Sequence, residues 1–169
     1  MPLLDLNLIA LDPSTTPEAF VEKLRHQRPD TKVVVASIPH HWVARPAVHD
    51  VKHLGDSRWD MMLVTEGELS QATEVHDLVK DVYNMKIGVP RKLYANYPIT
   101  NEKLLREAKS EQKWWDEVAI VHYPSIRHFC DMAAGEDYQE INQKYRLPSL
   151  EDTILLCTTE LPRKTASKL

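Results

Sequence analysis

"LLDLNLIALDPSTTPEAFVEKLRHQRPDTKVVVASIP" (residues 3–39) carries the signals that decide the fold. Residues 3–12 are mostly apolar, which predicts a β-strand that enters a core. Thr15 or Thr16 then precedes Pro17, as at the start of a helix, and apolar side chains follow at helical spacing at Phe20, Val21 and Leu24. Residues 31–39 are β-branched and nearly continuously apolar, which is typical of a strand covered on both faces. The stretch therefore predicts a strand, a helix and a second strand.

The same alternation continues along the chain. Apolar runs predict strands at residues 58–67, 114–124 and 150–161, with a weaker edge strand at 91–100. Helices are predicted at 70–85 and 101–113, and in the first of these the helical spacing is that of Val75, Leu78, Val79 and Val82. Ser125 and Asp137 are predicted to cap two more helices, and residues 40–57 to form an irregular crossing with one short helix.

Length and composition predict one globular domain, residues 1–161, followed by a polar tail at 162–169. The net charge is −4, from 21 basic and 25 acidic residues, and no basic cluster is evident, so nucleic acid is not an expected partner. No run reaches the roughly 20 apolar residues that span a bilayer, and the start lacks the basic region of a signal peptide. Cys130 and Cys157 form no CxxC pair and are predicted to be buried thiols. We expect a cytoplasmic protein that is not associated with a membrane.

Several motifs are absent from the sequence. It contains only four glycines and no GxGxxG, P-loop or GxSxG pattern, so nucleotide cofactors and serine-hydrolase chemistry are not expected. His49 and His53 stand four residues apart, a spacing that can bind zinc on a helix. The glutamate of HExxH is missing and no third ligand is defined, so we predict loop or pocket-lining histidines and no metal site.

Candidate catalytic residues begin with His122, at the end of the predicted strand 114–124. Strand alternation places it on one face with Val118 and Ile120, and Tyr123 on the other. An imidazole gains and loses a proton near neutral pH, so His122 is a candidate acid or base. The structural alternative is a histidine that only hydrogen-bonds a carbonyl at a strand end.

Further candidates are polar or aromatic residues in apolar surroundings. Asn7 and Asp5 share a face of the first strand with Ile9 and Leu11, so they require partners or a wet pocket. Arg146 and Tyr138 could supply a cation and a hydroxyl to a developing anion, or could simply belong to an ordinary helix. The predicted pocket lining is apolar and aromatic, and it comprises Trp59, Met62, Phe129 and Tyr138, with Asp5.

The final third of the chain, "VAIVHYPSIRHFCDMAAGEDYQEINQKYRLPSLEDTILLCTTE" (118–160), resembles the second half of a ferredoxin-like unit of the dimeric α/β-barrel superfamily. The pattern is close to that of small proteins, common in fungi, related to the EthD and antibiotic-biosynthesis monooxygenase groups. The resemblance implies an α+β fold, with a four-stranded antiparallel sheet, helices on one face, and a second subunit that pairs with the other face to close a barrel. Residues 40–57 and 67–113 would then be insertions, longer than a minimal member needs.

The resemblance also implies an internal pocket, which relatives use for varied reactions, often without metal or organic cofactor. We therefore expect a cofactor-independent enzyme that cyclises, isomerises or decarboxylates an apolar biosynthetic intermediate. In this hypothesis His122 is the acid or base, and Asn7, Tyr123 or Arg146 orients an oxygen. Two alternatives stay open: a cofactor-free oxygenase of an electron-rich ring, and a non-catalytic homodimer that binds a metabolite or a protein.

Overall fold

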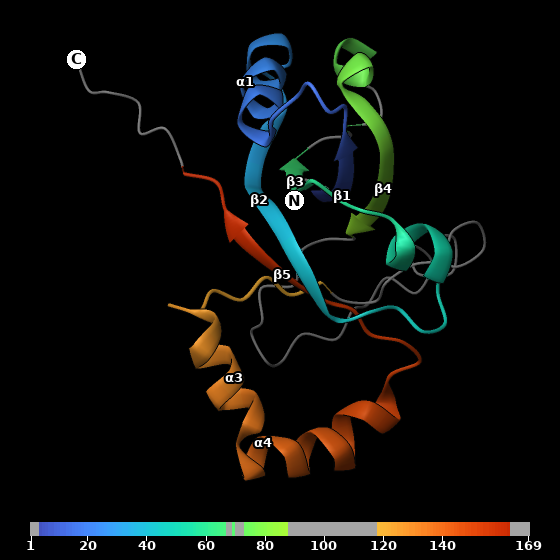
Figure 1. Ribbon diagram of the computed structural model, residues 1–169, viewed down its shortest axis with the longest axis vertical. Coiled ribbons are helices and arrows are strands. Elements are labelled where there is room, and N and C mark those ends of the chain that lie inside the picture. Colours follow the sequence, from blue (N-terminus) through green and yellow to red (C-terminus); the bar gives the residue numbers. More distant parts are fainter. Residues whose placement is uncertain (1–3, 67–68, 70–72, 88–117, 163–169) are drawn as a thin grey trace, which may run out of the picture.

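The computed structural model describes residues 4–66, 69, 73–87 and 118–162. The described residues form an α+β fold built on a five-stranded antiparallel sheet. The sheet has helix α1 on one side, and the C-terminal helices lie beyond its far end (Figure 1). None of the helices in these ranges is long and apolar enough to cross a membrane.

The first predicted strand, helix and strand are confirmed as β1 (Leu4–Leu11), α1 (Pro17–Gln27) and β2 (Lys32–Ala44). Thr16 is the N-cap of α1, and its hydroxyl accepts a hydrogen bond from the Ala19 amide at 3.2 Å. The helix buries the predicted stripe, Phe20, Val21 and Leu24. The prediction succeeded because capping, proline and hydrophobic periodicity all indicate the same helix.

The strand order is β4-β1-β3-β2-β5, with β3 at Met61–Glu66, β4 at Val79–Ile87 and β5 at Leu155–Glu160. Strand β2 joins two regions, because its first half, to Ser37, pairs with β3 and its second half, from Ser37 to Ala44, pairs with β5. Figure 1 shows β2 running from beside α1 towards the C-terminal helices. The sheet therefore connects a compact N-terminal region with a C-terminal region.

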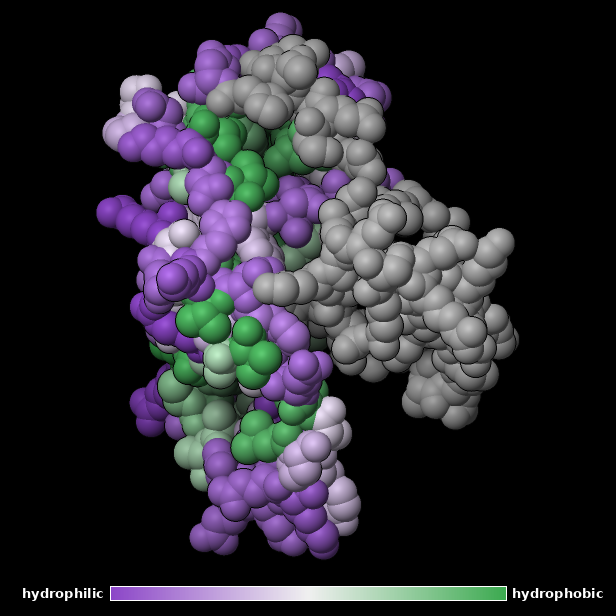
Figure 2. Space-filling model, turned by 90° about the vertical axis from the view of Figure 1, so that its right-hand side faces the viewer, coloured by the Kyte–Doolittle hydropathy of each residue, from purple (hydrophilic) through white to green (hydrophobic). Residues whose placement is uncertain are grey.

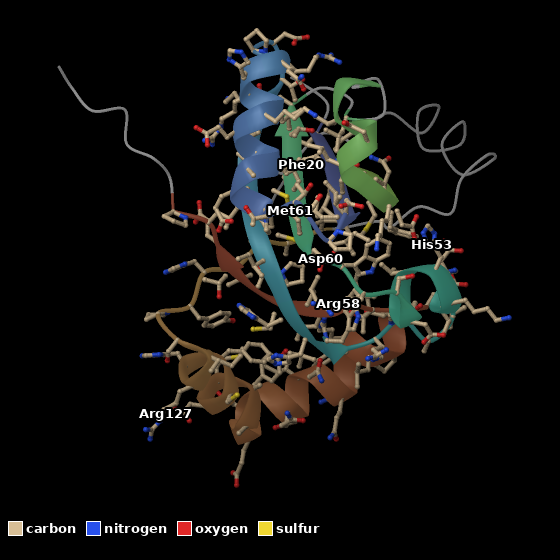
Figure 3. All side chains as sticks on the ribbon, turned by 45° about the horizontal axis from the view of Figure 1, so that its top comes forward. Phe20, His53, Arg58, Asp60, Met61 and Arg127 are labelled. Carbon is tan, nitrogen blue, oxygen red and sulfur yellow. The ribbon has the colours of Figure 1, made fainter. Side chains whose placement is uncertain are left out.

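Each face of the sheet has its own hydrophobic cluster. On the face covered by α1, Phe20 and Leu24 pack with residues of β1 and β3, among them Ile9, Met61 and Leu63. Figure 3 shows Phe20 of α1 above the strand that carries Met61. On the opposite face the cluster contains Leu6, Leu8, Leu54, Trp59, Met62, Val64, Tyr83 and Met85. Because both faces of β1 and β3 are buried, these strands carry apolar residues on both faces.

The C-terminal region contains α3 (Ile126–Ala134), α4 (Glu136–Ile141) and the short turns η4 (Asn142–Arg146) and η5 (Leu147–Ser149). No residue from 118 to 160 is buried. Several large apolar side chains here are exposed, among them Ile120, Val121, Ile126, Ile141, Tyr145, Leu147 and Leu150. Figure 2 shows hydrophobic groups at the surface of this part of the molecule.

The structure overturns the helix predicted at residues 70–85. Thr73–Leu78 form the 3-10 helix η3, and Val79–Ile87 form strand β4, which pairs with β1 throughout its length. The spacing of Val75, Leu78, Val79 and Val82 suits a helix, but Tyr83 and Met85 also alternate as in a strand. The open edge of β1 decides between them, because pairing with it satisfies the backbone of residues 79–87.

Two further expectations are wrong. Residues 118–124, the described part of the predicted strand 114–124, are irregular and largely exposed. They are not part of the sheet, whose strands β4 and β5 pair with β1 and β2 respectively. Cys130 is exposed on α3 and Cys157 is half-buried on β5, so neither is a buried thiol.

In the crossing at 40–57, β2 extends to Ala44 and the short helix is η1 (Val51–Gly55). The predicted strand 91–100, helix 101–113 and most of the tail lie outside the described residues.

Candidate functional site

A histidine and a carboxylate meet where η1 lies against β4. His53 of η1 donates a hydrogen bond through Nε2 to Oδ2 of Asp81 on β4 at 2.9 Å. Figure 3 shows His53 projecting from η1, on the side of the molecule where β4 lies. The two side chains are 47% and 44% exposed, so a molecule arriving from solvent can reach the imidazole. The carboxylate fixes which imidazole nitrogen carries the proton.

Tyr83 lies two residues after Asp81 on β4, and therefore on the same face of that strand. Its ring is buried and meets the His53 ring edge-on, with centroids 5.3 Å apart. Its hydroxyl donates a hydrogen bond to Oδ2 of Asp50 at 2.9 Å. The site thus contains two carboxylate-bound proton carriers, an imidazole and a phenol, with their rings in contact.

Trp59 packs against the rings of both His53 and Tyr83. Its ring centroid lies 5.6 Å from that of His53 and 6.4 Å from that of Tyr83. The indole Nε1 donates to the carbonyl of Leu54 at 2.9 Å, so a buried polar atom has its partner and the ring orientation is fixed. His53 therefore rests on two buried aromatic rings that restrict its movement.

The loop before and within η1 is held in a specific conformation. Asp50 has φ of 48°, in the left-handed region that Asp and Asn tolerate better than most residues. Arg45 donates to the Gly55 carbonyl at 2.7 Å, which closes the loop from 45 to 55. Pro46 also packs against Gly55, where an added Cβ would lie 3.0 Å from Pro46 Cγ. These contacts set the direction in which η1 presents His53.

The arrangement is suited to proton transfer. A half-exposed imidazole bound to a carboxylate can take a proton from a substrate and return it to another atom. The carboxylate stabilises the imidazolium formed in between. Within the described ranges, no three His, Cys, Asp or Glu side chains gather to hold a metal ion. His49 and His53, the pair considered for zinc, have different partners: His49 lies 3.5 Å from Glu151, and His53 contacts Asp81.

Asn7 and Asp5, predicted from the first strand, lie on the face covered by α1. Both are buried, and Asn7 accepts a hydrogen bond from the amide of Asn84 on β4 at 2.7 Å. The buried Nδ2 of Asn7 has no hydrogen-bond partner among the described residues. Trp59 and Met62 belong to the cluster on the other face, so the sheet separates them from Asn7 and Asp5.

The remaining predicted residues lie in the C-terminal region. His122 is exposed, and in the described part of the chain no side-chain hydrogen bond or ion pair is found for it. Tyr123 packs edge-on against Phe129 with centroids 5.5 Å apart, and Tyr138 is half-buried on α4. Arg146 donates to Asn142 at 3.2 Å and to Thr153 at 3.4 Å. The predicted site residues thus occupy three separate places.

Asp81, Tyr83 and Asp50 are site residues that sequence reasoning missed. Residues 70–85 were predicted to be helical, and on a helix Asp81 and Tyr83 would point in different directions. The alternation of "VKDVYNM" (79–85) as a strand would have placed them on one face. His53 was considered only as a metal ligand or as loop or pocket lining. Its partner on β4 is 28 residues away, and no local pattern indicates it.

Comparisons of the chain with protein-family models, curated proteins and solved structures give no match. Function is therefore inferred from the geometry of the described residues.

Proposed function

We propose that the chain is an acid/base enzyme that transfers a proton on a small, largely apolar molecule without a cofactor. The single observation that carries the proposal is the half-exposed His53–Asp81 pair, with an N···O distance of 2.9 Å, resting on Trp59 and Tyr83. His53 accepts a proton from the substrate and returns it elsewhere, and Asp81 stabilises the imidazolium. The reaction is an isomerisation, cyclisation or decarboxylation, since each can proceed by such transfers. In this proposal His53 takes the role that the sequence suggested for His122.

Apolar side chains around the pair indicate the kind of substrate. Val48 and Val51, on either side of His49 and Asp50, are 56% and 38% exposed. Trp59 and Tyr83 supply aromatic surface beneath His53. An apolar molecule that contacts the two valines removes their exposed surface from water, which favours binding by about 25 cal/mol per Å². Two carboxylates, Asp50 and Asp81, bind the phenol and the imidazole of the site, so the proposed substrate carries no negative charge at this point.

We further propose that the sheet is a ferredoxin-like unit. Two observations support this: β1, α1, β2, β3, η3 and β4 follow in that order, and their strands are arranged β4-β1-β3-β2. In such a unit a split βαβ motif places β3 between β1 and β2, as observed. The unit then comprises residues 4–87, and β5 is an addition beside β2.

A homodimer belongs to the same proposal, in the form of a dimeric α/β barrel. Obligate dimers bury roughly 2,000–5,000 Å² in total and have markedly hydrophobic interfaces. The exposed apolar residues of 118–155 are suited to such an interface. Sedimentation equilibrium tests it: the expected mass is twice that of one chain, and a monomer at micromolar concentration would exclude the dimer.

The acid/base role can be tested without the natural substrate. 5-Nitrobenzisoxazole is a small, neutral, aromatic probe that opens to a coloured phenolate when a base removes its ring C–H proton. We expect the protein to open it faster than the same concentration of free imidazole, since the pair lies beside apolar surface. His53→Gln should reduce the rate to the background, and Asp81→Asn should reduce it partly.

Two other histidines provide matched controls. His40 is on β2, with Nε2 2.7 Å from the Thr159 hydroxyl, and no carboxylate among the described residues binds it. His122 is the histidine suggested by the sequence. His40→Gln and His122→Gln should retain the wild-type rate. If His53→Gln keeps the rate, the proposed site is wrong. If His122→Gln loses it, the acid/base group is the one expected from the sequence.

A further inference from the structure

We infer that Asp152 is a positioning residue for this site, acting through the loop that carries Asp50 and leads into η1. Asp152 lies just before β5, more than 100 residues along the chain from that loop. It does not touch the proposed reacting group. The inference rests on the proposed function in naming the site, but its structural readout is independent of activity.

The carboxylate of Asp152 receives three consecutive backbone amides. Ala47 donates to Oδ1 at 3.0 Å and to Oδ2 at 3.2 Å, and Val48 and His49 each donate to Oδ2 at 2.9 Å. The amide of Thr153 also donates to Oδ1, at 2.8 Å. Successive amides that converge on one anion define a backbone nest, and the anion fixes the conformation of the residues that form it. Residues 47–49 are therefore held by a single side chain.

The residue that follows these three amides is Asp50. Its left-handed φ of 48° lets the chain leave the nest and enter η1, and its carbonyl accepts the amide of Leu54 at 2.7 Å. Its carboxylate accepts the Tyr83 hydroxyl at 2.9 Å. A connected path thus runs from Asp152 through residues 47–49 to Asp50, and from there to Tyr83 and to the helix of His53. If the nest is lost, residues 47–50 are no longer held in this conformation. Even a small displacement of catalytic groups lowers the reaction rate.

Partial desolvation raises the pKa of Asp152, but the hydrogen bonds from the amides of His49, Ala47, Val48 and Thr153 outweigh it and lower the pKa to about 2. Asp152 is therefore ionised throughout the neutral range, and its carboxylate accepts the amides of residues 47–49 at every pH in that range. Glu151 is the adjacent carboxylate and lies 3.5 Å from Nε2 of His49, not on the backbone amides. It is a matched control for the effect of charge alone.

The test compares Asp152→Asn, Glu151→Gln and Asp50→Asn by two measurements. The first is the carbon-13 signal of the Tyr83 ring, assigned with Tyr83→Phe, which reports the Tyr83–Asp50 hydrogen bond whether or not the protein is an enzyme. The second is the rate of 5-nitrobenzisoxazole opening. Urea unfolding of each variant shows that the chain is folded under the conditions of measurement.

We expect Asp152→Asn to move the Tyr83 signal in the same direction as Asp50→Asn and to slow the probe reaction on the order of 10-fold. Glu151→Gln should change neither. If Asp152→Asn does not fold, Asp152→Glu should shift the same signal, because it keeps the charge but moves the carboxylate one methylene farther from the backbone of residue 152. An unchanged Tyr83 signal in a folded variant at position 152 would overturn the inference. A shifted signal together with a wild-type rate would also overturn it, because Asp152 would then hold only the loop. Failure of the proposed function is distinguished by His53→Gln retaining the rate.

Discussion

His53 and Asp81 form a 2.9 Å hydrogen bond although 28 residues separate them in the chain. One comes from the short helix after β2, the other from the edge strand β4. The bond therefore exists only when η1 has docked against the folded sheet, and it sets the histidine on the rings of Trp59 and Tyr83.

The His53–Asp81 pair should affect activity much more than stability. Both side chains are nearly half exposed, and such ion pairs contribute less than about 1 kcal/mol. Asp81→Asn should therefore change the free energy of unfolding by under about 1 kcal/mol while lowering the probe rate. Urea unfolding and probe kinetics on the same preparation check both parts. A loss of several kcal/mol would show that Asp81 is chiefly a structural residue.

The Asp152 nest predicts a specific acid sensitivity. The pKa of Asp152 is about 2 when folded, below the usual value near 3.9 for an unfolded chain. Its contribution to stability is thus complete above about pH 4 and is lost as the pH falls towards 2. Asp152→Asn should be less stable than wild type at pH 6, with a difference that shrinks between pH 4 and 2.

Glu151→Gln is the control for this pH series and should not reproduce that convergence. Asp12 and Asp30 also have lowered pKa values, because Ser14 and Arg28 respectively hydrogen-bond them. Both variants should therefore retain some acid sensitivity. Unfolding curves that stay equally far apart at pH 6 and pH 2 would contradict the role given to the nest.

Close packing of Pro46 on Gly55 predicts a rescue experiment. A Cβ at Gly55 would lie 3.0 Å from Cγ and 3.2 Å from Cδ of Pro46, and a proline ring has little freedom to move away. Gly55→Ala should therefore destabilise the chain by about 1–3 kcal/mol, as overpacking does. In a Pro46→Ala background the same change should cost much less. Equal costs in the two backgrounds, measured by urea unfolding, would rule out this contact as the cause.

Phe20 is the clearest test of the core. It is fully buried between α1 and the sheet, in the cluster that includes Met61 (Figure 3). Phe20→Ala should lower the free energy of unfolding by about 3–5 kcal/mol, because a cavity is left beneath the helix. Arg25→Ala, on the exposed side of the same helix, should change it by less than about 0.5 kcal/mol. A similar cost at both positions would contradict the assigned faces of α1.

The C-terminal third shows where pattern reading fails. "VAIVHYP" (118–124) has the composition of a strand, yet β4 and β5 lie beside β1 and β2, and residues 118–124 form no strand. The pattern at 70–85 fits both a helix and a strand, and the open edge of β1 selected the strand. In both places the outcome depends on which edges of the sheet are free, and no short window of sequence contains that information.

The sequence by itself determined the elements whose local signals agree. The run of residues 4–11, the Thr16 cap with Pro17, the stripe of α1 and the β-branched start of β2 each specify one structure through periodicity and capping. It also determined that Asn7 and Asp5 share the face of Ile9, because alternation along a strand is local. Only the tertiary structure decided that His53, Asp81, Tyr83, Asp50 and Asp152 are connected. These contacts join segments far apart in the chain, and they form through sheet pairing and backbone amides, which leave no periodic signature in the sequence.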